Sequence, residues 1–265
     1  MTNDSSTPQP TGTNPAGIPV YTFGGLEFVR VPKGKFIMGS EVGDREKPQH
    51  EVDIPYDYWI GRFPVNNAQC NEFVQAMGAR PPVYNEHPVL DWSKRRDHPV
   101  VFVTWEFAMS YCMWLNELHG SELPEGYQFR LPTEAEWEKA ARGRNGNEWP
   151  WGNVFDPTRS NCDGASKTTT PIGKYSPRGD SPYGVTDMAG NVWEWCHSLY
   201  EPYPYKADDG REDETASGDR VLRGGSFLLG RGHARGAYRS SSVPRWPSLI
   251  NIGFRVAASP ISPVK

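Results

Sequence analysis

The chain has 265 residues, of which 37% are hydrophobic and 12% aromatic, with 10 Trp, 27 Gly and 25 Pro. This composition is typical of a folded, loop-rich protein whose core depends on aromatic side chains, and it excludes a helical bundle. The formal net charge of −4 argues against wholesale nucleic-acid binding, and no apolar run approaches the length needed to span a bilayer.

Residues 1–17 are rich in Thr, Asn and Pro and lack the apolar core of a signal peptide. We expect them to form a disordered tail, because so polar a segment buries too little surface to offset its chain entropy. The domain is then expected to occupy residues 18–265. The expected compartment is the cytoplasm; export by another route is the alternative.

The first part of the domain alternates apolar and polar residues as β-strands do. Residues 28–40 alternate around Pro32-Lys33-Gly34, which predicts a hairpin, and residues 49–60 predict a further strand. A Pro-rich loop is predicted over residues 80–99. The short apolar run over residues 100–103 predicts another strand.

Two helices are predicted from capping residues and apolar periodicity. Asn66 and Asn67 can cap a helix that ends at Gly78. Thr104 can cap the longest helix, which ends at Gly120. The apolar stripe of this longest helix is expected to belong to the core.

A third helix is predicted to begin at Pro132 and Thr133. Glu134, Glu136 and Glu138 lie in its first turns, where the helix dipole favours negative charge. We therefore interpret these glutamates as helix-end and solvent-facing residues, with acid–base catalysis as the alternative.

The four cysteines are Cys70, Cys112, Cys162 and Cys196, and no two of them form a C-x-x-C motif. This spacing indicates neither a zinc knuckle nor a disulfide framework. Buried free thiols are expected.

Residues 183–195 combine two turn-forming glycines, Gly184 and Gly190, with two large indoles, Trp193 and Trp195. This pattern predicts a turn that leads into a buried strand. The acidic, Tyr- and Pro-containing stretch over residues 200–219 is predicted to be a surface loop.

Asp187 and Glu194 lie within the same motif. Carboxylates among turn carbonyls are suited to a hard cation that holds loops in place. From the residues alone, a surface acid and a capping acid are the alternative.

Several separated motifs resemble the formylglycine-generating enzyme (sulfatase-modifying factor) family, whose fold is similar to that of C-type lectins. Besides residues 183–195, they are Arg130-Leu-Pro-Thr-Glu-Ala-Glu-Trp-Glu138, Arg223-Gly-Gly-Ser226 and Gly253-Phe-Arg255, in the expected order. The resemblance implies an α+β, C-type-lectin-like fold with small antiparallel sheets, flanking helices and long loops.

The same resemblance implies structural calcium. The Asn161 side chain and the Cys162 carbonyl match one calcium loop of the family. A second site is matched by Asp187, Glu194 and the backbones of Gly190 and Val192.

The catalytic residues that the resemblance would imply are missing. In the formylglycine-generating enzymes two cysteines, five residues apart, bind copper and engage the substrate cysteine; the ungapped positions here are Leu229 and Ala234. Neither side chain can bind a soft metal or form a thiolate, so we expect no copper and no catalytic residue. The non-haem iron branch of the family needs an H-x-x-x-H-x-E run, which the histidines at positions 50, 87, 98, 119, 197 and 233 do not supply.

Residues 228–250 contain no Lys, Glu, Asp, Gln or Met. Around them stand residues typical of the family, here called frame positions: Arg223-Gly-Gly-Ser226, Arg235, Ala237, Arg239, Pro244 and Ile252-Gly-Phe-Arg255. This pattern resembles the variable region of proteins diversified by retroelements, here residues 223–256, in which template adenines are randomised. An inactive family member whose loop has drifted is the alternative.

The sequence therefore predicts a non-catalytic, ligand-binding display protein, with a cysteine oxidase or a degenerate inactive family member as the alternatives. The expected contact residues, here called free positions, are Leu228, Leu229, Gly230, Arg231, His233, Tyr238, Ser240, Ser241, Ser242, Val243, Arg245, Trp246, Ser248, Leu249 and Ile250. Tyr238 and Trp246 would act as anchors among small polar residues, as in a paratope.

Four arginines, Arg231, Arg235, Arg239 and Arg245, make this segment basic and favour a macromolecular partner with an acidic patch. The frame arginines Arg235 and Arg239 can instead be satisfied internally. Nucleic acid is a weaker candidate, because the basic residues follow no recognisable binding motif.

Overall fold

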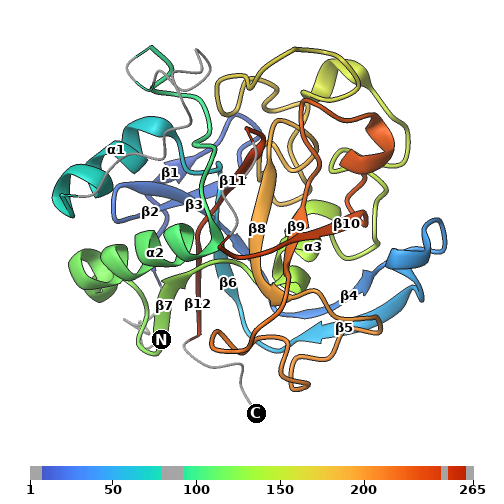
Figure 1. Cartoon of the computed structure of the whole chain (residues 1–265), viewed down its shortest axis with the longest axis horizontal. Helices are drawn as coiled ribbons and strands as arrows, with labels where there is room; N and C mark the ends of the chain where they lie inside the picture. The colour runs from blue at the N-terminus through green and yellow to red at the C-terminus, as the bar shows by residue number, and fades with distance from the viewer. Residues whose placement is uncertain (1–7, 79–91, 93, 246–249, 261–265) are drawn as a thin grey trace.

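A computed structural model describes residues 8–78, 92, 94–245 and 250–260 and shows an α+β fold (Figure 1). Its strands and α-helices are β1 (Gly12–Thr13), β2 (Pro19–Phe23), β3 (Leu26–Val31), β4 (Gly34–Met38), β5 (His50–Ile54), β6 (Tyr58–Gly61), α1 (Asn67–Ala76), α2 (Trp105–His119), β7 (Tyr127–Arg130), α3 (Glu134–Arg142), β8 (Trp193–Leu199), β9 (Arg220–Arg223), β10 (Arg239–Ser242), β11 (Ile252–Phe254) and β12 (Ala257–Pro260). Small sheets, flanking helices and long connections agree with the predicted fold class.

The larger sheet has the strand order β1-β2-β3-β6-β12-β7, and its neighbouring strands are antiparallel. Its C-terminal strand lies in the interior, because Ala257 pairs with Ile60 of β6 on one side and with Arg130 of β7 on the other. The ends of the domain therefore depend on each other for their hydrogen bonds.

The second sheet has the order β10-β9-β8-β11, in which β11 runs parallel to β8. Every residue of β8 is buried, which confirms the predicted turn and buried strand. Gly190 has φ +87°, and a Cβ there would lie 2.5 Å from the Asn161 carbonyl oxygen. The turn before β8 thus requires glycine.

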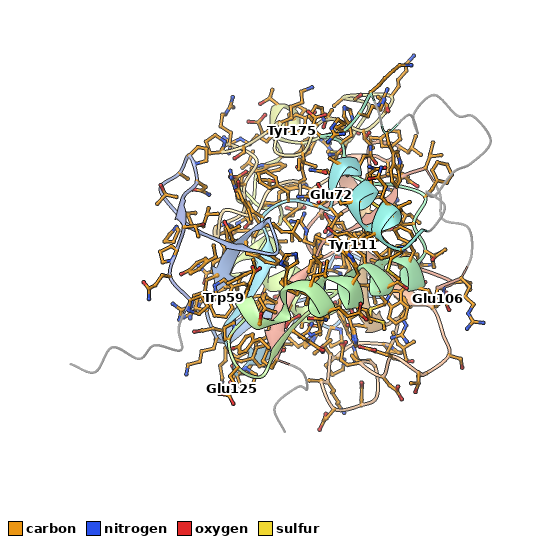
Figure 2. The ribbon with its side chains drawn as sticks, turned by 90° about the vertical axis from the view of Figure 1, so that its left-hand side faces the viewer. Trp59, Glu72, Glu106, Tyr111, Glu125 and Tyr175 are labelled. Carbon is orange, nitrogen blue, oxygen red and sulfur yellow. The ribbon has the colours of Figure 1, made fainter. Side chains whose placement is uncertain are left out.

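The predicted helices α1 and α2 are confirmed. Asn66 caps α1 in a capping box, and Thr104 accepts a hydrogen bond at the start of α2. Both helices lie on the side that faces the viewer in Figure 2. Tyr111 of α2 packs edge-on against Phe73 of α1 and Phe254 of β11, which joins the helices to the second sheet.

The third helix, α3, begins after the Thr133 cap as predicted, but its environment differs from the expectation. All of its residues are buried, and the Glu134, Glu136 and Glu138 side chains have no exposed surface. The prediction that they face solvent is therefore wrong. Each carboxylate has an arginine partner from elsewhere in the protein or from the helix itself.

Two strand predictions are corrected by the structure. The strands β3 and β4 do not form a hairpin, because β3 pairs with β2 and β6 whereas β4 pairs with β5. Residues 100–103 are not a strand, since Phe102 has φ +62° and interrupts the extended backbone. The stretch over residues 49–60 contains two strands, β5 and β6.

Residues 8–17, which we expected in the disordered tail, are ordered. The strand β1 pairs with β2, and the Asn14 side chain accepts hydrogen bonds from the backbone of Ala16 and Ile18. A polar side chain that satisfies a turn offsets the lack of apolar surface here. Residues 1–7 lie outside the described residues.

The four cysteines are buried and free, as expected. Residues 200–219 form a loop as predicted, but the loop does not lie wholly on the surface. Tyr203 and Tyr205 are buried and attach it to the domain. Among the described residues, no helix is long and apolar enough to cross a membrane.

Candidate functional site

The connection from β9 to β11 carries the short 3-10 helix η5 (Arg231–Ala234) and the edge strand β10 (Figure 1). Its ends are fixed in the second sheet, because β9 and β11 both pair with β8. Gly225, which leads into the connection, has φ +71°, and a Cβ there would lie 2.7 Å from the His233 carbonyl oxygen. Backbone contacts therefore hold the connection close to the sheet.

Side-chain exposure separates the free positions from the frame positions. Exposed free positions are Leu228, Gly230, Arg231, Val243 and Arg245, and partly buried ones are Leu229, His233, Tyr238, Ser240, Ser241, Ser242 and Ile250. The frame positions are buried except Pro244, which is partly buried. Trp246, Ser248 and Leu249 lie outside the described residues.

Buried ion pairs attach the frame to α3. Arg239 donates two hydrogen bonds of 2.7 Å to the Glu134 carboxylate. Arg223 donates to Glu138 and lies over the Trp137 ring at 5.4 Å. Burial and the opposing charges of Arg223 and Arg142 act in opposite directions on Glu138, and the net effect lowers its pKa.

A further ion pair fixes the turn between η5 and β10. Arg235 donates to both oxygens of Glu46, which is itself buried. Of the four arginines predicted to make the segment basic, Arg235 and Arg239 are thus satisfied internally. Only Arg231 and Arg245 remain exposed; Arg245 pairs with Glu106 at 2.5 Å and Arg231 lies over the Phe155 ring at 5.4 Å.

Two of the free positions also support the core. Tyr238 packs against the ring of Trp193 at 6.0 Å and that of His233 at 4.8 Å, and Leu229 packs against the main apolar cluster. We therefore expect Leu229 and Tyr238 to tolerate fewer substitutions than the exposed free positions.

Fixed loops flank the free positions on both sides. The backbone N–H of Asp163 donates to the Leu229 carbonyl at 2.9 Å. At the other end, the Ser241 hydroxyl donates to Asp219 at 3.2 Å. Asp219 was not predicted to lie beside this surface, because nothing in an acidic loop indicates which strand it will contact.

A cleft of about 480 Å³ lies beside β10. It is lined by residues 214–219 of the loop, by Val243, Pro244 and Arg245, and by Trp105, Glu106 and Arg220. Two free positions, Val243 and Arg245, thus line the same cleft as the loop over residues 214–219.

The positions that correspond to the family's catalytic cysteines cannot supply that chemistry. Leu229 is partly buried, and Ala234 is buried beside Cys162 and Trp149. Burial raises the pKa of the Cys162 thiol and of the Cys196 thiol, so neither forms a thiolate readily.

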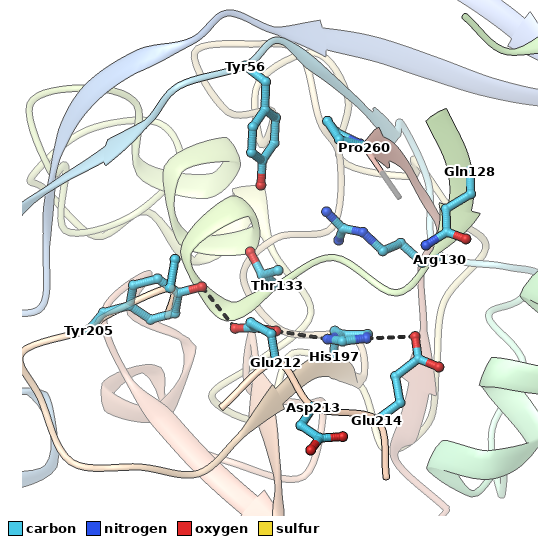
Figure 3. Close-up of a pocket in the computed structure, with 11 residues that line it drawn as sticks. Tyr56, Gln128, Arg130, Thr133, His197, Tyr205, Glu212, Asp213, Glu214 and Pro260 are labelled. Carbon is cyan, nitrogen blue, oxygen red and sulfur yellow. Dashed lines mark hydrogen bonds and ion pairs between the residues drawn. The ribbon is translucent and has the colours of Figure 1, made fainter. Parts of the chain in front are cut away.

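A separate cavity of about 290 Å³ lies under the loop over residues 200–219 (Figure 3). In its wall, His197 Nδ1 lies 2.8 Å from Glu212 and Nε2 lies 3.0 Å from Glu214. Tyr205 and Ser198 donate to the other oxygen of Glu212 at 2.8 and 2.5 Å. This cluster was not predicted from the sequence, because its members come from β8 and from the loop over residues 200–219.

Burial lowers the pKa of His197, but its hydrogen bonds to Glu212 and Glu214 raise it more, so the net pKa lies above the ordinary value. With both ring nitrogens donating, His197 has no lone pair to accept a proton. The cluster therefore attaches the loop to β8 and does not form a catalytic base.

The residues predicted to bind calcium differ in how free their side-chain oxygens are to bind an ion. Asn161 Oδ1 is buried without a hydrogen-bond partner, as a cation ligand would be in the absence of its ion. Asp187 is partly buried with φ +56°, and burial raises its pKa to about 6. Both oxygens of Glu194, by contrast, accept hydrogen bonds of 2.6 Å from Arg255.

The backbone brings the two predicted calcium loops together. Asn161 and Gly190 form an isolated parallel bridge, and the N–H of Asn191 donates to the Asn161 carbonyl at 2.8 Å. The Cys162 carbonyl accepts from Ala165, and Val192 is buried just before β8. The described residues contain no cluster of three or more His, Cys, Asp or Glu side chains that could hold a metal ion.

Comparison with known proteins gives one consistent family. Residues 22–260 match the model of the sulfatase-modifying factor enzyme 1-like domain. The chain is 34% identical, over 90% of its length, to serine/threonine-protein kinase pkn1 of Chlamydia caviae, but it spans only 38% of that protein. It is 31% identical over 88% of its length to the formylglycine-generating enzyme of Thermomonospora curvata, of which it covers 94%.

Two further similarities bear on activity. The chain is 29% identical over 88% of its length to inactive C-alpha-formylglycine-generating enzyme 2 of Mus musculus, of which it covers 85%. The solved structure of Treponema denticola variable protein 1 superposes with a TM-score of 0.69 at 26% identity, over 91% of this chain and 98% of that one. The relatives thus include a protein named as an enzyme, one named as inactive and one named as variable.

Proposed function

This chain belongs to the sulfatase-modifying factor enzyme 1-like family, and from that premise we propose that it binds a partner through residues 228–250 and does not oxidise a protein cysteine. One observation carries this proposal: Leu228, Gly230, Arg231, Val243 and Arg245 are exposed on a connection whose frame positions, except Pro244, are buried. A surface held in this way can change its contact residues without changing its scaffold.

The second argument is chemical. A copper oxidase of this family needs two thiolates where this chain has Leu229 and Ala234, and the cysteines of this chain are buried away from the surface. Similarity to a relative named as inactive supports the same conclusion. A degenerate family member without any ligand is the second candidate, and the binding experiment below separates the two.

We further propose that a retroelement diversifies this segment. The absence of Lys, Glu, Asp, Gln and Met from residues 228–250 supports this proposal, as does the similarity to variable protein 1. A reverse-transcriptase gene and a near-copy of the codons for residues 223–256 in the neighbouring DNA would be the expected signature.

The partner is best sought among proteins. Serines and one tyrosine offer adaptable hydrogen bonds and rigid contact area, which suits a protein surface. Because Arg235 and Arg239 are internally paired, the attraction to an acidic patch rests on Arg231 and Arg245 alone. We therefore expect a modest dependence of affinity on salt.

Calcium is proposed as a structural ion. Asn161 would contribute a side-chain oxygen at the first predicted site and Asp187 at the second, with carbonyls of the adjoining turns completing the oxygen set that calcium prefers. Glu194 fits this role poorly, because Arg255 and Trp137 already use its carboxylate.

The decisive experiment compares two libraries. One randomises the exposed free positions Leu228, Arg231, Val243 and Arg245 together with Ser240–Ser242; the other randomises Arg235, Ala237 and Arg239. We expect the first library to fold and to yield binders to an immobilised test protein such as lysozyme, because exposed sites typically change stability by less than about 0.5 kcal/mol.

The second library should rarely fold, since it breaks buried ion pairs. Phe254→Ala serves as a core control and should cost about 3–5 kcal/mol. The proposal would be overturned if most members of the first library failed to fold, or if folded members gave no binder.

A further inference from the structure

Residues 214–219 lie beside the free positions although they belong to the loop before β9. They line the same cleft as Val243 and Arg245. Asp219 accepts a hydrogen bond from Ser241 at 3.2 Å. A ligand that contacts Val243 and Arg245 would therefore also meet this loop.

Two groups hold the loop in place. Arg220 donates to the carbonyls of Asp213, Glu214 and Ala216, and its guanidinium lies 4.2 Å from the Trp105 ring. His197 of β8 provides the second attachment, between Glu212 and Glu214. The charge of arginine is permanent, whereas that of histidine depends on pH.

We propose that residues 214–219 are a fixed wall of the binding surface and that His197 is the positioning residue that releases this wall when it loses its proton. The inference rests on the proposed function, because it names the regulation of the same surface. A neutral imidazole has a single N–H and can donate to only one of the two glutamates. The other carboxylate then faces a lone pair.

Glu214 is the glutamate expected to leave. Its side chain is 50% exposed, whereas that of Glu212 is 8% exposed and also accepts from Tyr205 and Ser198. Since Glu214 is the first residue of this loop that lines the cleft, its release would loosen the wall at residues 215–219.

The charged groups around His197 set the direction of the effect. Glu212 and Glu214 face the ring from the loop, Arg130 of β7 lines the same cavity, and Arg220 of β9 donates to the His197 carbonyl. The carboxylates outweigh burial and Arg130, so the pKa of His197 is raised. A raised pKa means that the attachment is intact at low pH and is lost as the pH rises through that value.

The test uses a fluorophore in the wall. The four native cysteines are buried, so the exposed Ser217 can be replaced in Ser217→Cys and labelled selectively with bimane. Trp105 lines the same cleft, so we expect it to quench the dye while the wall is in place. We expect emission to rise along a single titration curve as the pH is raised above the ordinary pKa of histidine.

The variants His197→Gln and Glu214→Gln should abolish this titration. The matched control is His119→Gln, which removes another histidine–glutamate pair, His119–Glu122 at 2.7 Å, outside the loop. It should titrate like the parent protein. A flat parent curve, or an unchanged titration in Glu214→Gln, would overturn the proposal even if His197→Gln failed to fold.

A binding measurement separates this inference from the proposed function. A lysozyme binder from the library of free positions should lose affinity at high pH, and Glu214→Gln should remove that dependence. If the dye responds to pH but the affinity does not, the wall is not part of the surface, although the proposed function stands. A library without binders would contradict the proposed function itself.

Discussion

Arg231 and Arg235 lie on the same short stretch of backbone but differ in almost every physical respect. Arg235 is buried and bound to both oxygens of Glu46, whereas Arg231 is exposed above Phe155. A similar contrast separates the other frame positions, which are buried except Pro244, from the exposed free positions Leu228, Gly230, Val243 and Arg245. The residues that stabilise the fold and the exposed residues that can contact a partner are therefore different, whereas Leu229 and Tyr238 also pack against the core.

The largest expected effect on stability comes from replacing Arg235 by alanine. Arg235→Ala leaves Glu46 as a buried, unpaired charge and should lower the free energy of unfolding by about 3–5 kcal/mol. Arg231→Ala should change it by less than about 0.5 kcal/mol. Chemical denaturation of both variants measures the difference, and equal effects would contradict the division into frame and free positions.

Two glycines of the same connection, Gly225 and Gly230, should also differ in their effect on stability, although less than the two arginines do. Gly225→Ala places a side chain at φ +71° against the His233 carbonyl and should cost at least about 1–2 kcal/mol. Gly230→Ala is the matched control, because the nearest atom to its Cβ is 3.5 Å away and its φ is −69°. Thermal denaturation should leave this control close to the parent protein.

Calcium should act on the scaffold and not on the free positions. If it binds at Asp187, it should raise the melting temperature by about 2–4 °C for each kcal/mol of binding free energy. Asp187→Ala should remove most of this shift, and Asp163→Ala, an exposed acid close to Asn161, should keep it.

The calcium effect should depend on pH. Because burial raises the pKa of Asp187 to about 6, the carboxyl is protonated below that pH and open to a cation above it. The shift in melting temperature should therefore be larger at about pH 8 than at about pH 5. A shift that is the same at both values, or absent at both, would refute Asp187 as the ligand.

The last prediction is that the protein has no oxidase activity. The protein should not convert cysteine to formylglycine in a sulfatase-type peptide, with or without copper, because Leu229 and Ala234 replace the thiols. Mass spectrometry of the peptide measures conversion, and the Thermomonospora curvata relative is the positive control. Turnover above a no-protein blank would show that the protein is catalytic and would contradict the proposed function.

Local signals predicted local structure well. Asn66, Thr104 and Thr133 each accept the capping hydrogen bond expected from the sequence, so the three helices begin where predicted. The frame positions were recognised from their family motifs, and their burial agrees with a scaffold role.

Long-range pairing could not be predicted in the same way. The burial of Glu134 depends on Arg239, which lies 105 residues later in the sequence, and no local pattern indicates such a partner. The choice of β5 instead of β3 as the partner of β4 is also non-local, and so is the contact of His197 with Glu212. Residue type alone could not distinguish a solvent-facing glutamate from one that is ion-paired and buried.

The position of β12 has a consequence for the synthesis of the protein. This strand leaves the ribosome after residues 228–250 but lies between β6 and β7, so the larger sheet can close only when that segment has been translated. A stop codon or frameshift within the segment would remove both β11 and β12 and leave unpaired strand edges. Such truncated chains would be open to proteolysis, and the folded population would consist of chains that carry the complete segment.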